Sequence, residues 1–184
     1  MQLRHLHLRQ QSNLKMSTRK VALSLAVLTI FFVIQESAMS QFRLPGGGFS
    51  IFLILVFVWS AISASEIALV IGFAAGFMLD LVQASDSPFG QWTLILILVC
   101  YLVSYVGFGD TNPLGVVFIV IAANFAAQVL FLASGALLGV QIGALGQILI
   151  TLVGTSIWTL VFTPMVLPLF SKLHEFIFET RASL

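Results

Sequence analysis

The sequence predicts an all-α integral membrane protein, with six transmembrane helices in one bundle. Its composition is 59% hydrophobic and only 8% charged, whereas soluble domains carry about 25% charged residues. Apolar segments of nearly the length that crosses a bilayer, roughly 20 residues, alternate with short segments rich in glycine, proline and aspartate. The 184 residues therefore leave almost no soluble mass outside the membrane.

The expected spans are separated by breaks of different strength. Proline and glycine interrupt the chain clearly at residues 42–48, 85–90 and 109–113. The break near residues 61–65 is the weakest, so a chain of five spans is the main alternative. The six expected spans are residues 21–39, 49–63, 65–84, 91–107, 114–138 and 145–170.

The distribution of charge predicts the orientation. Five basic residues crowd the first twenty positions, and no acidic residue occurs before Glu36. Between Arg43 and Lys172 the chain has no lysine or arginine. By the positive-inside rule the N-terminus is expected in the cytoplasm, and six spans return the C-terminus to the same side.

The chain is accordingly divided into a basic cytoplasmic arm (1–20), a membrane bundle (21–170) and a short amphipathic cytoplasmic tail (171–184). The basic arm, the apolar run and the small residues at 37–40 also resemble a secretory signal peptide. The length of the apolar run favours a retained span instead.

The third span carries a narrow stripe of small residues. At 100° per residue, positions four apart nearly align, which places Ala68, Gly72, Gly76 and Asp80 on one face. Small residues let another helix backbone approach closely in a membrane. The stripe predicts helix packing, either within the bundle or against a different protein.

Asp80 closes this stripe near the predicted outer end of the span. An aspartate at the centre of a membrane helix costs roughly 2.5–3.5 kcal/mol on insertion scales. Its expected role is to accept hydrogen bonds from the following turn or from a neighbouring helix. A proton relay or ligand site is the weaker alternative, because no lysine, arginine or histidine lies within any expected span.

A second polar stripe runs along the fifth and sixth spans at a spacing of four residues. Amides and hydroxyls at this spacing predict hydrogen bonds between helices, of about 0.6–2 kcal/mol each; a solute path is the alternative. The stripe comprises Asn124 and Gln128 in the fifth span, and Gln147, Thr151, Thr155, Thr159 and Thr163 in the sixth.

Two prolines, Pro164 and Pro168, are expected to bend or end the sixth span. The tail beyond it would place Leu173, Phe176 and Ile177 on one side. This side could lie on the inner membrane surface or meet a cytoplasmic partner.

Signatures of enzymes are absent from the sequence, including nucleophile, metalloprotease and phosphate-loop motifs. His5 and His7 lie in the basic arm without a nearby carboxylate or cysteine, and Cys100 is the only cysteine. The sequence therefore predicts a protein without catalytic residues, cofactor or metal, and without a nucleic-acid partner.

Residues 68–105, "ALVIGFAAGFMLDLVQASDSPFGQWTLILILVCYLVSY", resemble the signature region of the rod-shape-determining protein MreD family. That family's pattern is GFxxGLxxDL, a short gap, PLG, and an apolar helix ending in YL. Met78 stands where the family usually has leucine. The matching positions are Gly72, Phe73, Gly76, Asp80, Leu81, Pro88, Gly90, Tyr101 and Leu102.

The resemblance implies a non-catalytic subunit of the bacterial elongation machinery in the inner membrane. Such proteins pair with MreC and help to link MreB filaments to the lateral-wall glycosyltransferase and transpeptidase. The family's fold is similar to the substrate-binding subunits of energy-coupling-factor transporters, which makes a vitamin-binding subunit the alternative. The obvious loop candidates for that role are Asp86, Phe89 and Trp92.

Overall fold

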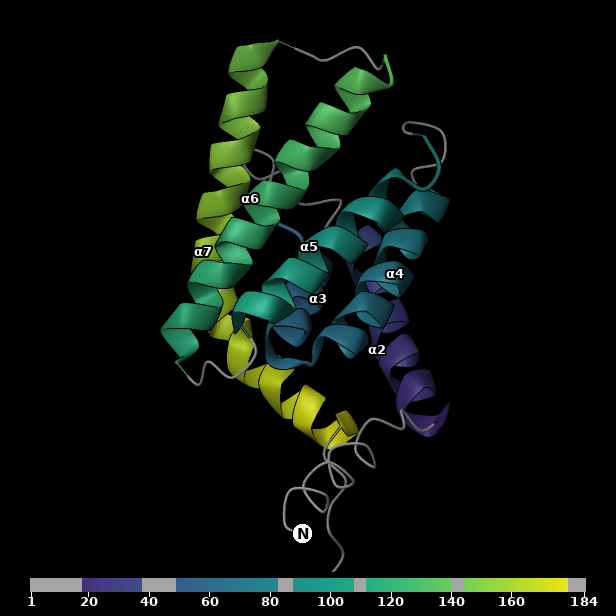
Figure 1. Cartoon of the computed structure of the whole chain (residues 1–184). Coiled ribbons are helices and arrows are strands. Elements are labelled where there is room, and N and C mark those ends of the chain that lie inside the picture. Colours follow the sequence, from purple (N-terminus) through teal and green to yellow (C-terminus); the bar gives the residue numbers. More distant parts are fainter. Residues whose placement is uncertain (1–17, 38–48, 83–87, 108–111, 140–143, 179–184) are drawn as a thin grey trace, which may run out of the picture.

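The chain folds into a bundle of α-helices, shown in Figure 1. The computed structural model describes residues 18–37, 49–82, 88–107, 112–139 and 144–178. The described residues form six helices, whose order matches that of the six expected spans. The helices are α2 (Thr18–Ser37), α3 (Ile51–Ile62), α4 (Ser65–Val82), α5 (Gln91–Gly107), α6 (Pro113–Leu137) and α7 (Leu145–Phe178).

Four of these helices, α2, α4, α6 and α7, are long and apolar enough to cross a membrane. The other two are shorter: α3 has 12 residues and α5 has 17. At 1.5 Å per residue they are about 18 Å and 26 Å long, against a hydrocarbon core of about 30 Å. The all-helical class is thus confirmed, and the lengths are consistent with a multi-pass protein, while six full crossings are not established.

Helix α3 forms the centre of the bundle. Ten of its twelve residues are buried, and it packs against each of the other five helices. Its sequence, IFLILVFVWSAI, is apolar on almost every side, and a helix of this composition is buried all round. The side chain of Ser50 accepts a hydrogen bond from the Leu53 N–H at 3.2 Å and caps the first turn.

Ser63 and Ala64 separate α3 from α4, at the break that the sequence marks only weakly. Ser63 is extended, with φ −104° and ψ 154°. Its carbonyl accepts a hydrogen bond from the Ser104 hydroxyl at 2.7 Å, and its own hydroxyl lies 2.8 Å from Nε2 of His174. Contacts to two distant segments therefore hold this break, and the chain forms two helices here rather than one.

Helix α7 does not end at its prolines. It contains Pro164 and Pro168 and continues to Phe178, eight residues beyond the expected end at 170. Figure 1 shows the yellow C-terminal part of α7 running at an angle to its green part. Proline removes one helical hydrogen bond and bends a membrane helix that neighbouring groups support.

The bent end of α7 packs against the bundle. The indole Nε1 of Trp59 donates to the carbonyl of Phe170 at 3.0 Å, and the ring of His174 meets the Trp59 ring edge-on at 6.2 Å. Ile177 is buried, whereas Phe176 is 78% exposed. The expected apolar side of the tail therefore does not include Phe176, which points away from the bundle.

The beginning of α2 and the end of α7 lie at the same end of the bundle (Figure 1). The end of α4 and the start of α5 lie at the opposite end, as do the end of α6 and the start of α7. The expected positions of His5, His7, Arg43, Asp86 and Asp110 lie outside the described residues.

Candidate functional site

The small-residue stripe of α4 faces α5 of the same chain. The contact between α4 and α5 is the most extensive among the described helices. Ala68, Gly72, Gly76 and Asp80 are all buried. The stripe that the sequence left open to a different protein is therefore covered from within the bundle.

Gly72 and Gly76 allow this contact because neither position has room for a side chain. A Cβ atom at Gly72 would lie 2.7 Å from the carbonyl oxygen of Leu96. At Gly76 it would overlap the Cα atom of Thr93 and lie 2.8 Å from the carbonyl oxygen of Trp92. The obstacle in both cases is helix backbone, which cannot move aside as a flexible side chain can.

The carboxylate of Asp80 binds the first turn of α5. Its Oδ1 accepts from the backbone N–H of Trp92 at 2.9 Å, and its Oδ2 accepts from the backbone N–H of Thr93 at 2.9 Å. The Thr93 hydroxyl donates to the same Oδ2. Asp80 is 1% exposed, so these bonds offset the free energy of burying a carboxylate.

Gly90 is the reason that the first turn of α5 is capped by a side chain from another helix. The carbonyl of Gly90 accepts from the Leu94 N–H at 3.0 Å, which makes Gly90 the N-cap residue, immediately before α5. Its φ is +94°, a conformation that favours glycine. Glycine has no side chain to cap the free N–H groups of the first turn, and Asp80 takes that role across the helix contact.

Pro88 completes the turn. Its carbonyl accepts from the Gln91 N–H at 3.2 Å. The negative carboxylate of Asp80 also lies at the positive end of the α5 dipole, where an anion is stabilised. The arrangement joins the last turn of α4 to the first turn of α5.

Reasoning from the sequence missed Gln91 and Thr93, and it named Trp92 only as a loop candidate for the transporter alternative. The Gln91 amide Nε2 donates to the carbonyl of Phe131 at 2.8 Å and lies 2.7 Å from the hydroxyl of Ser134. The available signal was Gly90, because a glycine at the start of a helix leaves N–H groups that need an acceptor from elsewhere.

Phe73 does not join the other motif residues at the α5 contact. It is 53% exposed, on the side of α4 away from the stripe. Its ring lies 6.2 Å from that of Phe77, which in turn meets Phe89 edge-on at 6.1 Å. Leu81 is also exposed, so these apolar side chains form an outer surface of α4.

In the polar stripe of α6 and α7, Gln128 and Thr155 form hydrogen bonds between the two helices. The Gln128 Nε2 and Oε1 atoms lie 2.9 Å and 3.0 Å from the hydroxyl of Thr155. Asn124 is buried, and its Nδ2 has no hydrogen-bond partner among the described residues. The amides therefore do not form a continuous ladder with α7.

The other threonines of this stripe bond within α7. The Thr151 hydroxyl donates to the carbonyl of Gln147 at 3.0 Å. Thr159 and Thr163 donate in the same way to the carbonyls four residues earlier. The expectation of interhelical bonds is thus wrong for these three hydroxyls, because the helix's own carbonyls are nearer acceptors.

A metal site would require several ligating side chains in one place. Within residues 18–37, 49–82, 88–107, 112–139 and 144–178, no three of the His, Cys, Asp and Glu residues come together in that way.

Comparison of the chain with protein-family models, with curated proteins and with solved structures finds no match.

Proposed function

We propose that the protein is a non-catalytic scaffold subunit of the bacterial cell-elongation machinery, of the MreD type. The observation that carries the proposal is the arrangement of its signature residues. Gly72, Gly76, Asp80 and Gly90, which carry the resemblance, each have a distinct role in one contact between α4 and α5. That these four motif residues serve a single helix contact supports a structural role for this region.

The proposed setting is the bacterial cytoplasmic membrane, with both termini in the cytoplasm. The start of α2 and the end of α7 lie at the same end of the bundle, which supports this topology. The basic N-terminal arm supports it as well. In this orientation Asp80 and the turn at Pro88 and Gly90 face the outer side.

The proposed partner is an MreC-type membrane protein. With the glycine stripe covered by α5, the surface that α4 still offers is the exposed side carrying Phe73, Phe77 and Leu81. Aromatic side chains, phenylalanine included, are enriched at the cores of protein interfaces relative to the rest of the surface. Through this partner the subunit would act, directly or indirectly, on an MreB-type filament and on the elongation glycosyltransferase and transpeptidase, surrounded by membrane lipid.

The experiment is co-purification of the full chain with the MreC-type protein encoded in the same genome, in mild detergent. Phe73→Ala is expected to lower the recovered partner by about tenfold, the change that an interface residue contributing roughly 1.4 kcal/mol produces. The matched control is Phe118→Ala, since Phe118 is 67% exposed on α6. It should leave recovery unchanged.

Depletion of the protein in its own bacterium provides the cellular test, with loss of rod shape as the expected result. Rods that persist after depletion, together with no recovery of an MreC-type protein, would overturn the proposal. Recovery of a transport ATPase and nanomolar binding of a vitamin would replace it with the transporter alternative.

A further inference from the structure

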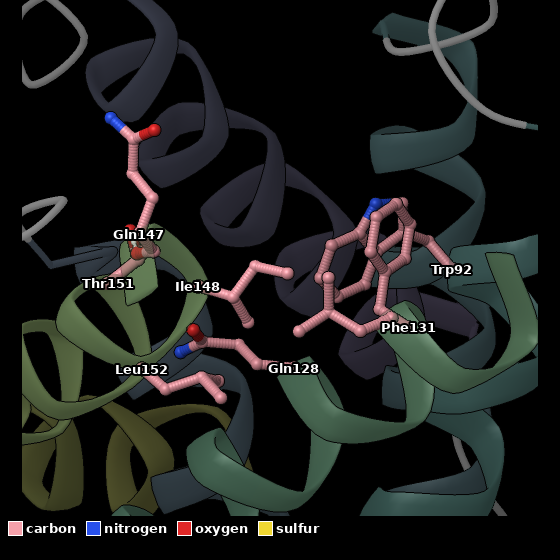
Figure 2. Close-up of a pocket in the computed structure, with 8 residues that line it drawn as sticks. Trp92, Gln128, Phe131, Gln147, Ile148, Thr151 and Leu152 are labelled. Atoms are coloured by element: carbon pink, nitrogen blue, oxygen red, sulfur yellow. Dashed lines mark hydrogen bonds between the residues drawn. The ribbon is translucent and has the colours of Figure 1, made fainter. Parts of the chain in front are cut away.

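A cavity lies between α5, α6 and α7, at the end of the bundle that also holds Asp80 and the Gly90 turn (Figure 2). Its volume is about 300 Å³. Ligand pockets range from about 300 to 1,000 Å³, so this one suits a small molecule. Its lining residues are Trp92, Gln128, Phe131, Leu132, Gln147, Ile148, Thr151 and Leu152.

One wall of the cavity is a stacked pair of aromatic rings. The rings of Trp92 and Phe131 lie 4.5 Å apart with an interplanar angle of 20°, and Figure 2 shows them overlapping. Asp80 holds the backbone of Trp92, and Gln91 holds the carbonyl of Phe131. Both rings are therefore positioned by hydrogen bonds of the backbone that carries them, without help from a ligand.

The facing wall carries polar groups on α7. Gln147 and Thr151 are exposed there, and Figure 2 shows the Gln147 amide extending away from the aromatic pair. Gln128 places a third polar side chain between α6 and α7.

None of the eight lining residues carries a charge. A phosphate or carboxylate headgroup would therefore find no cation here, and a ligand amine would find no carboxylate. Aromatic faces favour a flat partner in offset stacking. The Gln128 amide and the Thr151 hydroxyl would orient a ligand that can donate or accept a hydrogen bond.

We propose that this cavity binds a small, uncharged, flat molecule that carries a hydroxyl or amide group. The ligand would stack beside Trp92 and Phe131 and form hydrogen bonds with Gln128 or Thr151. This inference does not depend on the scaffold role, because it rests on the cavity alone.

A second groove, along the other side of the α6–α7 contact, has different chemistry. It is lined by exposed apolar side chains that include Phe118, Phe125, Ile157 and Leu160, with Ser156 as its single polar residue. This composition suits lipid chains. Ser156 therefore provides a matched control position on the same helix.

The test uses two cysteine variants of the full chain in lipid nanodiscs, Thr151→Cys and Ser156→Cys. The two hydroxyls make the same kind of hydrogen bond in α7, since each donates to the carbonyl four residues earlier, at 3.0 Å and 2.7 Å. Cys100 is buried and serves as the internal background. The rate of labelling by N-ethylmaleimide is measured with and without 2-naphthol, an uncharged flat alcohol.

At a 2-naphthol concentration about ten times its dissociation constant, labelling of Thr151→Cys is expected to slow about tenfold, because roughly one site in eleven remains free. Labelling of Ser156→Cys should be unchanged. The anion 2-naphthoate should protect neither position. Adding Phe131→Leu, or Phe131→Ala, to Thr151→Cys should remove the protection while the protein stays monodisperse.

Three results would overturn the proposal. Equal slowing at both cysteines would show that 2-naphthol acts through the bilayer. Labelling of Thr151→Cys that 2-naphthol does not slow would show that the cavity does not take such a molecule. Equal protection of Thr151→Cys by 1-dodecanol, insensitive to Phe131, would assign the cavity to an acyl chain.

Discussion

Asp80 accepts a hydrogen bond from the backbone N–H of Trp92 at 2.9 Å, and the ring of Trp92 stacks on Phe131 at 4.5 Å. One residue of α5 therefore connects the last turn of α4 to the wall of the cavity on α6. Since Gln91 also binds the Phe131 carbonyl, the start of α5 is fixed on two sides. A change at Asp80 should accordingly affect the aromatic pair as well as the α4–α5 contact.

Gly76→Ala is expected to destabilise the protein by about 1–3 kcal/mol, the usual range for overpacking. The added methyl group would overlap the backbone of Thr93. The measurement is the free energy of unfolding from titration of mixed micelles with denaturing detergent. Gly146→Ala is the control, because nothing lies within 4 Å of a Cβ atom there. If Gly76→Ala left the free energy of unfolding unchanged, the close contact between α4 and α5 would be contradicted.

Asp80→Asn should be tolerated better than Asp80→Leu. Asparagine keeps one oxygen that can accept from a backbone N–H of α5, whereas leucine leaves the N–H groups of Trp92 and Thr93 without their acceptor. Each buried unsatisfied group costs about 1–3 kcal/mol, so Asp80→Leu should lower the free energy of unfolding by several kcal/mol relative to the wild type. Detergent unfolding measures the difference. Equal losses with both substitutions would indicate that the negative charge itself is required.

Thr93→Val tests the hydroxyl that binds Asp80. Valine is expected to cost about 1.5–3 kcal/mol, typical of a hydrogen bond to a charged group, while Thr93→Ser retains the hydroxyl and should cost less. In a double-mutant cycle with Asp80→Asn, the two changes should show a coupling energy of about 0.5–3 kcal/mol. Additive effects would mean that Thr93 and Asp80 do not interact.

The helix order and several boundaries could be predicted from local sequence because glycine, proline and aspartate mark most turns. Helix α5 begins at Gln91 and ends at Gly107, as expected. Asn112 and Pro113 begin α6, where the Asn112 side chain accepts from the Leu114 N–H at 3.1 Å. The depth of α3 in the bundle could not be predicted from length alone, although its apolar composition is typical of a buried helix.

The sequence predicted that Asp80 accepts hydrogen bonds from the following turn or a neighbouring helix. The donors, Trp92 and Thr93, could not be predicted, because spacing along α4 defines a face and not what covers it.

Whether the two prolines of α7 would bend or end the helix could not be predicted either, for a related reason. Pro164 and Pro168 are local signals for a break, while the groups that hold the helix beyond them, Trp59 and Ser63, lie far away in the sequence. Distant contacts of this kind decide whether a proline ends a membrane helix or bends it.

Trp59→Phe tests how the bent end of α7 is held. Phenylalanine retains an aromatic ring in the centre of the bundle but removes the indole N–H that donates to the Phe170 carbonyl at 3.0 Å. A lost hydrogen bond of about 0.5–1.5 kcal/mol should raise local opening of residues 171–178 by roughly two- to tenfold. Hydrogen exchange followed by mass spectrometry measures this opening. The control, Phe176→Ala, removes a ring that is 78% exposed and should leave exchange unchanged. If Trp59→Phe has no effect on residues 171–178, the indole N–H does not hold the bent end of α7.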